Sequence, residues 1–195
     1  MRFKICVSGA AEGSCVNPKN IEKAKAIGAA IAEHDCIIVT GATSGLPHYA
    51  TIGAREKNGI SIGFSPAATY QDHVYRYHLP TNYLDLIVYT GFGYSGRNLI
   101  LTRSADAIIT ICGRIGTLNE FTIAFEDKKP LAVLTESGGI SDEIKELTEI
   151  AHKHQCPIIY EDDPAKLVSQ LIADLKQTRT EINQAHHSEK PSQQD

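Results

Sequence analysis

Short apolar runs alternate with amphipathic stretches along almost the whole chain. The apolar runs predict strands at 3–7, 36–39, 60–64, 86–89, 107–111, 131–134 and 157–160. Helices are expected between them, at 18–33, 46–57, 98–104, 117–127, 142–154 and 164–176. Because strand and helix alternate throughout, we expect an α/β protein in which a doubly wound, mostly parallel sheet carries helices on both faces.

These elements predict a single domain over residues 1–177. The remaining residues, 178–195, are polar and end in Pro-Ser-Gln-Gln-Asp, so we expect them to form a disordered tail. The segment 65–83 is rich in Tyr and His and is expected to be irregular.

Composition and charge narrow the class of protein. Hydrophobic residues make up 42% of the chain and charged residues 22%, which is typical of a globular protein. The 19 basic residues against 23 acidic ones argue against a nucleic-acid partner. No run reaches the ~18 apolar residues of a membrane span, and the N-terminus does not resemble a signal peptide. We therefore expect a cytoplasmic protein with no membrane partner.

The five cysteines, at positions 6, 15, 36, 112 and 156, are widely spaced and form no Cys-x-x-Cys pair. This pattern argues against a disulfide framework and against a structural zinc site. Cys6, Cys36 and Cys112 fall in apolar strand-like runs, where a thiol behaves as a small hydrophobic group. We expect reduced thiols and no metal site.

Glycine-bearing loops follow several of the predicted strands. In a parallel sheet, ligands bind beyond the carboxyl ends of the strands, so these loops are the candidate site. They comprise Ser8-Gly9-Ala10, a loop from Gly41 to Gly45 that includes Ser44, a loop from Gly91 to Gly96, and Gly113-Arg114-Ile115-Gly116-Thr117.

The loop after the strand at 107–111 carries the strongest local signal. Gly113 and Gly116 free the backbone, and Thr117 is expected to open a helix, whose N-terminus favours anions. Glu120 lies three residues after Thr117, a spacing that also fits a capping box. Arg97 lies in the same ligand-facing layer and, together with Thr117 and Glu120, would bind a phosphate and leave one carboxylate near a sugar.

The loop from Gly91 to Gly96 has the pattern Gly-x-Gly-x-x-Gly, which is found in dinucleotide sites. Arg114 lies about 20 residues further on, where an NAD site places an acid and an NADP site can place an arginine. An NADP-linked oxidoreductase is therefore one alternative.

Two stretches carry a family resemblance. Gly96-Arg97-Asn98, followed by Gly113-x-x-Gly116-Thr117-x-x-Glu120, resembles the LOG ("Lonely Guy") family, which is often mislabelled lysine decarboxylase. The Arg-Asn pair is also similar to that of the molybdenum-cofactor carrier proteins. The resemblance spans about residues 3–165 and implies a Rossmann-like nucleotide-binding fold that needs no cofactor and forms a homodimer.

The LOG resemblance implies hydrolysis of the N-glycosidic bond of a nucleoside 5′-monophosphate to free base and ribose 5-phosphate. It implies catalytic roles for Arg97 and Glu120. Substrate or phosphate binding falls on Gly41, Ser44, Gly45, Gly113, Arg114, Gly116 and Thr117.

The chain departs from the LOG pattern at three positions of the site. Cys112 replaces the family proline, Arg114 replaces a glycine, and Asn98 replaces a lysine. Asn98 and Arg114 favour an alternative function, a non-enzymatic carrier or sensor of a nucleotide or molybdenum cofactor. The Arg114 side chain either enters the site and contacts phosphate or points outward to a carboxylate, and the inward arrangement is expected.

Overall fold

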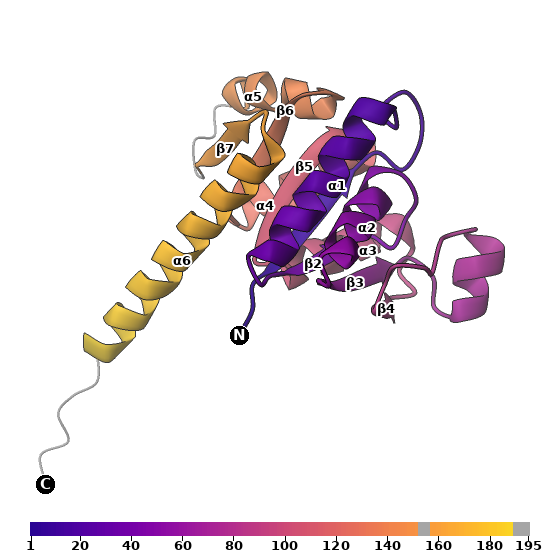
Figure 1. Cartoon of the computed structure of the whole chain (residues 1–195), viewed down its shortest axis with the longest axis horizontal. Coiled ribbons are helices and arrows are strands. Elements are labelled where there is room, and N and C mark those ends of the chain that lie inside the picture. The colour runs from indigo at the N-terminus through magenta and orange to yellow at the C-terminus, as the bar shows by residue number, and fades with distance from the viewer. Residues whose placement is uncertain (152–156, 189–195) are drawn as a thin grey trace, which may run out of the picture.

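A single seven-stranded sheet forms the centre of the molecule (Figure 1). The computed structural model describes residues 1–151 and 157–188. All strand pairs are parallel, and the strand order is β4-β3-β2-β1-β5-β6-β7. The strands are β1 (Lys4–Gly9), β2 (Ile37–Thr40), β3 (Ile60–Ser65), β4 (Leu86–Tyr89), β5 (Ala107–Gly113), β6 (Leu131–Gly139) and β7 (Ile158–Glu161). The expected doubly wound parallel sheet is confirmed.

Helices cover both faces of the sheet because its central strands are apolar on both sides. In β1, Ile5 and Val7 pack into one hydrophobic layer, whereas Cys6 packs into the other. The first layer is closed by α1 (Pro18–Glu33), α2 (Leu46–Glu56) and α6 (Pro164–Ser188). The second layer is closed by α3 (Gly93–Ser104), α4 (Ile115–Glu126) and α5 (Ile140–Ile150).

The chain reverses its winding direction between β1 and β5. From β1 it passes through α1 to β2 on one side, and from β5 it passes through α4 to β6 on the other. Helices α1 and α4 lie on opposite faces, so the loops that follow β1 and β5 diverge and leave a crevice at the edge of the sheet. Such switch points are the usual ligand sites of open parallel sheets.

Helix α6 is longer than the sequence predicted. It continues to Ser188, so residues 178–188 are helical and not the expected disordered tail, while 189–195 lie outside the described residues. Arg179 stabilises this extension by lying 3.5 Å from the centre of the Phe3 ring and donating to the Met1 carbonyl at 2.8 Å. Figure 1 shows the second half of α6 extending away from the sheet.

Two other helices also have ends that differ from the sequence prediction. Helix α3 begins at Gly93 and not at 98, and α5 ends at Ile150. The rest of the helix expected at 142–154 falls partly on 152–156, outside the described residues. Within 1–151 and 157–188, no helix is both long and apolar enough to cross a membrane.

A disulfide joins Cys15 to Cys112, so the expectation of reduced thiols is wrong for this pair. The two residues are 97 positions apart in sequence, but the switch point brings their loops together and places their Cα atoms 5.7 Å apart. Spacing along the chain carries no sign of this contact. Cys6 and Cys36 are buried free thiols, as expected, and Cys156 lies outside the described residues.

Candidate functional site

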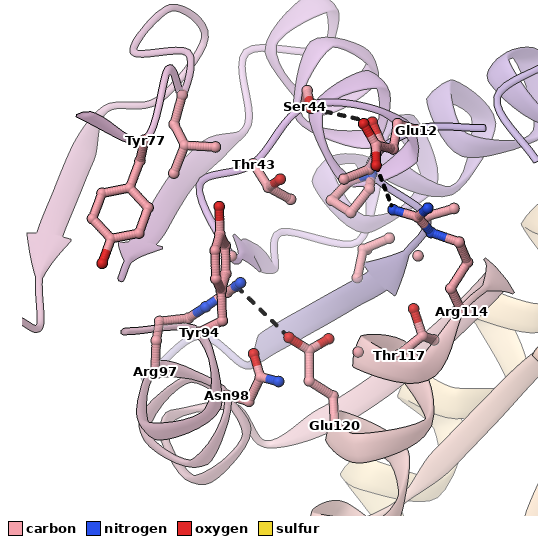
Figure 2. Close-up of a pocket in the computed structure, with 18 of the residues that line it drawn as sticks. Glu12, Thr43, Ser44, Tyr77, Tyr94, Arg97, Asn98, Arg114, Thr117 and Glu120 are labelled. Atoms are coloured by element: carbon pink, nitrogen blue, oxygen red, sulfur yellow. Dashed lines mark hydrogen bonds and ion pairs between the residues drawn. The ribbon is translucent and has the colours of Figure 1, made fainter. Parts of the chain in front are cut away.

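A cavity of about 520 Å³ opens at the carboxyl ends of the central strands (Figure 2). Seven of the nine predicted site residues line it: Gly41, Ser44, Arg97, Arg114, Gly116, Thr117 and Glu120. The other two, Gly45 and Gly113, are not among its lining residues. Gly45 precedes α2 with a positive φ of 71°, and a Cβ on Gly113 would lie 2.3 Å from that of Thr117.

Arg97 and Glu120 meet at the floor of the cavity. Arg97 comes from α3 and Glu120 from α4, and both side chains are buried. The Nη1 atom of Arg97 lies 3.6 Å from Oε1 of Glu120. Ser8, at the end of β1, donates a short hydrogen bond from Oγ to Oε2 of Glu120. The carboxylate is thus held from two sides by groups that belong to different elements.

Asn98 adds an amide beside this pair. Its nitrogen donates to Oδ1 of Asn119 at 2.9 Å, and with the amide turned over it donates to Oε1 of Glu120, also at 2.9 Å. Asn98 therefore occupies the place of the family lysine as a neutral neighbour of the Glu120 carboxylate, and Arg97 is the cation that contacts it.

Burial controls the protonation of Glu120. Removal from water raises the pKa of the Glu120 carboxyl, while the nearby Arg97 charge and the Ser8 hydrogen bond lower it, and the net shift is upward. The Cys6 thiol lies close by in the core, and burial together with the Glu120 charge raises its pKa well above the usual range. The floor of the cavity therefore holds one carboxyl poised to accept a proton.

The start of α4 differs from the expected capping box. The helix begins at Ile115, two residues before Thr117, and Arg114 precedes it without a capping hydrogen bond from its side chain. The Glu120 carboxylate bonds to Ser8 and not to the helix N-terminus, so the capping interpretation is wrong. The unpaired N–H groups of the first turn are left for other acceptors.

Gly116 lies in this first turn and lines the cavity. A Cβ built on Gly116 meets no atom within 4 Å. Protein packing therefore does not require a glycine at position 116, and the space beside this residue is open to a ligand at the positive end of the α4 dipole.

Arg114 stands at the rim of the cavity. Its Nη2 donates to Oε1 of Glu12 at 3.0 Å, and both side chains are largely exposed (Figure 2). Of the two arrangements considered from the sequence, the structure shows the pairing with a carboxylate. A phosphate contact by Arg114 remains a prediction.

The Gly-x-Gly-x-x-Gly loop does not form a dinucleotide site at the switch point. It follows β4, the edge strand, and none of Gly91, Gly93 and Gly96 lines the cavity. The loop instead starts α3, whose next turn carries Arg97 into the site. The position of the loop removes the basis for an NADP-linked oxidoreductase.

Ser8 and Tyr94, which lie in two of the loops expected to form the site, contact Glu120 and line the cavity, respectively. Glu12, Tyr77 and His78 also line the cavity but lie outside the expected loops. Of these three, only Glu12 carried a usable signal, because it closely follows a predicted strand. Among the described residues, no three His, Cys, Asp or Glu side chains gather as a metal ion would require.

A match to a known family profile shows the family to which this chain belongs. The sequence profile of the SLOG cluster4 family matches residues 2–168. The chain belongs to the SLOG cluster4 family. It is therefore one of the LOG/SLOG-like Rossmann-type proteins, as its resemblance to the LOG family implied.

Solved structures similar to this SLOG chain share its fold. The molybdenum cofactor binding protein from Rippkaea orientalis is 26% identical with a TM-score of 0.70, covering 90% of this chain and 98% of that one. A molybdenum cofactor carrier protein from Chlamydomonas reinhardtii is 25% identical with a TM-score of 0.69, covering 89% and 99%. The structural genomics target TM1055 is 23% identical with a TM-score of 0.76, covering 88% and 99%.

One curated relative matches part of the SLOG chain. An uncharacterized protein from Archaeoglobus fulgidus is 29% identical over 108 residues, which is 55% of this chain. The matched region spans 66% of the length of that relative.

Proposed function

We propose that this protein binds a nucleoside 5′-monophosphate and hydrolyses its N-glycosidic bond, releasing free base and ribose 5-phosphate. The observation that carries the proposal is the buried Glu120 carboxyl, which faces Arg97 on the floor of an open cavity. A volume of about 520 Å³ lies within the range of small-molecule sites.

The first turn of α4 is the proposed phosphate site. Its free N–H groups and positive dipole end favour an anion, and the open space beside Gly116 lets a phosphate approach the backbone. Thr117 adds a hydroxyl on the same turn. With the phosphate there, the ribose lies toward Glu120, one turn further along the helix.

Glu120 then acts on the anomeric carbon. Glycosidic cleavage passes through a transition state with oxocarbenium character, which a nearby carboxylate stabilises. Water attacks the anomeric carbon, Glu120 accepts the water proton, and the electron pair of the breaking C–N bond goes to the base nitrogen. The proton is then passed to the departing base, for which a raised pKa of Glu120 is suitable.

Arg97 holds both the carboxylate and the substrate. Its Nη1 faces Glu120, and its buried Nε has no hydrogen-bond partner in the part of the chain that the structure describes. A buried unpaired N–H is costly, so a substrate oxygen that accepts from it would be favourable.

The test is to incubate the protein with a panel of nucleoside 5′-monophosphates and measure free base and ribose 5-phosphate. Release of both products in equal amounts by the wild-type chain, with little release by Glu120→Gln, is the expected result. Tight binding of a monophosphate with no release by the wild-type chain contradicts the hydrolase.

A carrier of a molybdenum cofactor or another nucleotide-like molecule is the second candidate. The 26% identical structure named as a molybdenum cofactor binding protein supports it, and so does the neutral Asn98 beside Glu120. A carrier binds its cargo reversibly and returns it unchanged, so recovery of intact ligand from the complex separates the two functions.

A further inference from the structure

The segment between β3 and β4 is ordered around a buried histidine. It contains the short π-helix η1 (Asp72–Arg76), and His73 within it is fully buried. The Nδ1 atom of His73 lies 2.8 Å from Oγ of Ser65, at the end of β3, and Nε2 lies 3.0 Å from the carbonyl oxygen of Pro80. The bond to Ser65 fastens the segment to the carboxyl end of β3, and the bond to Pro80 joins two parts of the segment to each other.

The residues that follow η1 line the cavity. Tyr77 and His78 lie at its wall together with Tyr94 from α3. The Tyr77 and Tyr94 rings meet edge to face, with centroids 5.6 Å apart. Tyr94 is still 50% exposed, so an aromatic surface is left open although the segment beneath it is anchored.

The aromatic wall, which we define as Tyr77 and Tyr94, lies away from the anion end of the site. Figure 2 shows these two rings on one side of the cavity, with Arg97 directly below Tyr94 in this view, Glu12 and Arg114 on the other side, and Glu120 between the two sides. The Arg97 guanidinium carbon lies 5.9 Å from the centre of the Tyr94 ring. The cavity therefore has a charged end, a floor with the Arg97–Glu120 pair, and an aromatic end.

A second observation points to a ligand in this space. Arg97 lines the cavity next to Tyr94 and is only 5% exposed, and among the described residues its buried Nε has no hydrogen-bond partner. The protein thus places a flat π surface and an arginine with an unpaired N–H next to each other. A planar heterocycle satisfies both, because its face stacks on a tyrosine and its ring nitrogens or exocyclic oxygens accept hydrogen bonds.

We infer that the aromatic wall binds a planar heteroaromatic ring of the ligand. The inference rests on the proposed function only for the direction of the ligand, with its phosphate at α4. Purine or pyrimidine nucleotides and phosphorylated pterins share this chemistry. The segment 66–83, which carries Tyr77, and the start of α3, which carries Tyr94, are then the parts of the chain that recognise the base.

The test compares ligands with and without a ring. A purine nucleoside 5′-monophosphate, a phosphorylated pterin and ribose 5-phosphate are titrated by calorimetry into the Glu120→Gln protein, which prevents turnover. We expect Tyr77→Leu or Tyr94→Leu to weaken binding of one or both ring-bearing ligands on the order of tenfold and to leave ribose 5-phosphate unchanged. The ligand whose affinity falls more is the one whose ring the aromatic wall binds.

Two matched variants control for a structural effect. Tyr94→Phe keeps the ring and should bind like the parent protein. Tyr75→Leu alters an exposed tyrosine of the same segment that does not line the cavity, and should also have no effect. Thermal melting of each variant confirms that the fold is retained.

Three results overturn the inference. The tyrosine variants lose affinity equally for ring-bearing ligands and for ribose 5-phosphate, they lose affinity for neither, or the parent protein binds none of the three ligands. Absence of the proposed hydrolase activity is a separate result. A chain that binds ring-bearing ligands through the aromatic wall but releases no free base supports the inference and contradicts the proposed function.

Discussion

Gly41 lies directly against the guanidinium group of Arg97, and a Cβ on residue 41 would come within 1.4 Å of Nη1. The predicted role of Gly41 in substrate or phosphate binding stays a prediction, and its position shows in addition that it makes room for Arg97. We expect Gly41→Ala to displace Arg97 and lower kcat about 100-fold, because small misplacements of reacting groups have large effects. Overpacking should also cost about 1–3 kcal/mol of unfolding free energy. Steady-state kinetics and urea unfolding measure both, and unchanged kinetics would contradict this role of Gly41.

Gly116→Ala is the matched contrast. The added methyl group meets no protein atom within 4 Å, and alanine favours a helix, so the melting temperature should stay the same or rise. Because the methyl group projects into the proposed phosphate space, we expect Kd for a nucleoside monophosphate to rise at least about tenfold, equivalent to 1.4 kcal/mol. Calorimetry checks this, and unaltered affinity would place the phosphate elsewhere.

Glu120→Gln should change both turnover and the pH dependence of stability. Loss of the carboxyl should lower kcat by about 10²–10⁴-fold. Because the pKa of Glu120 is raised in the folded state, its stabilising contribution is present below about pH 4.5 and is lost as pH rises through the raised pKa.

The stability difference between wild type and Glu120→Gln should therefore shift in favour of the variant as pH rises from about 4.5, the usual value for Glu. Urea unfolding of both proteins at several pH values measures this shift. Parallel stability curves would show that burial does not perturb Glu120.

Arg114 and Glu12 should affect phosphate binding in opposite directions. If the Arg114 guanidinium turns to the phosphate, Arg114→Gly should weaken the binding of a nucleoside monophosphate by about 10–100-fold. This is the loss that a charge-assisted hydrogen bond of about 1.5–3 kcal/mol implies. Glu12→Gln releases Arg114 and should tighten binding by up to about fivefold, since exposed ion pairs contribute up to ~1 kcal/mol. The nucleoside without phosphate is the control ligand, and equal changes for both ligands would exclude a phosphate role.

The Cys15–Cys112 disulfide should stabilise the fold. It closes a sequence separation of 97 residues, and removing such a cross-link costs about 2–4 kcal/mol. We expect a reductant to lower the melting temperature of the wild-type chain and to leave that of the Cys15→Ser, Cys112→Ser double variant unchanged. A reductant effect of equal size in both proteins would mean that it acts elsewhere.

The sequence by itself determined the order of strands and helices along the chain and the edge of the sheet at which the cavity lies. Alternation of apolar runs with amphipathic stretches is local, so it predicted six helices and seven parallel strands at nearly their observed positions. The same pattern placed Arg97 and Glu120 after strands, and parallel strands bring such positions to one edge. Helix boundaries moved, by as many as 12 residues at the end of α6, because helix ends depend on the contacts they make.

Only the tertiary structure decided which residues act together. The hydrogen bond from Ser8 to Glu120 joins residues 112 positions apart, and the disulfide joins residues 97 apart. The aromatic wall depends on a segment with no regular pattern, fastened by His73 to the end of β3. Such contacts arise from how the sheet winds and how loops pack across its switch point. These contacts depend on which remote segments lie close together after folding. The local pattern of apolar and polar side chains contains no information about that.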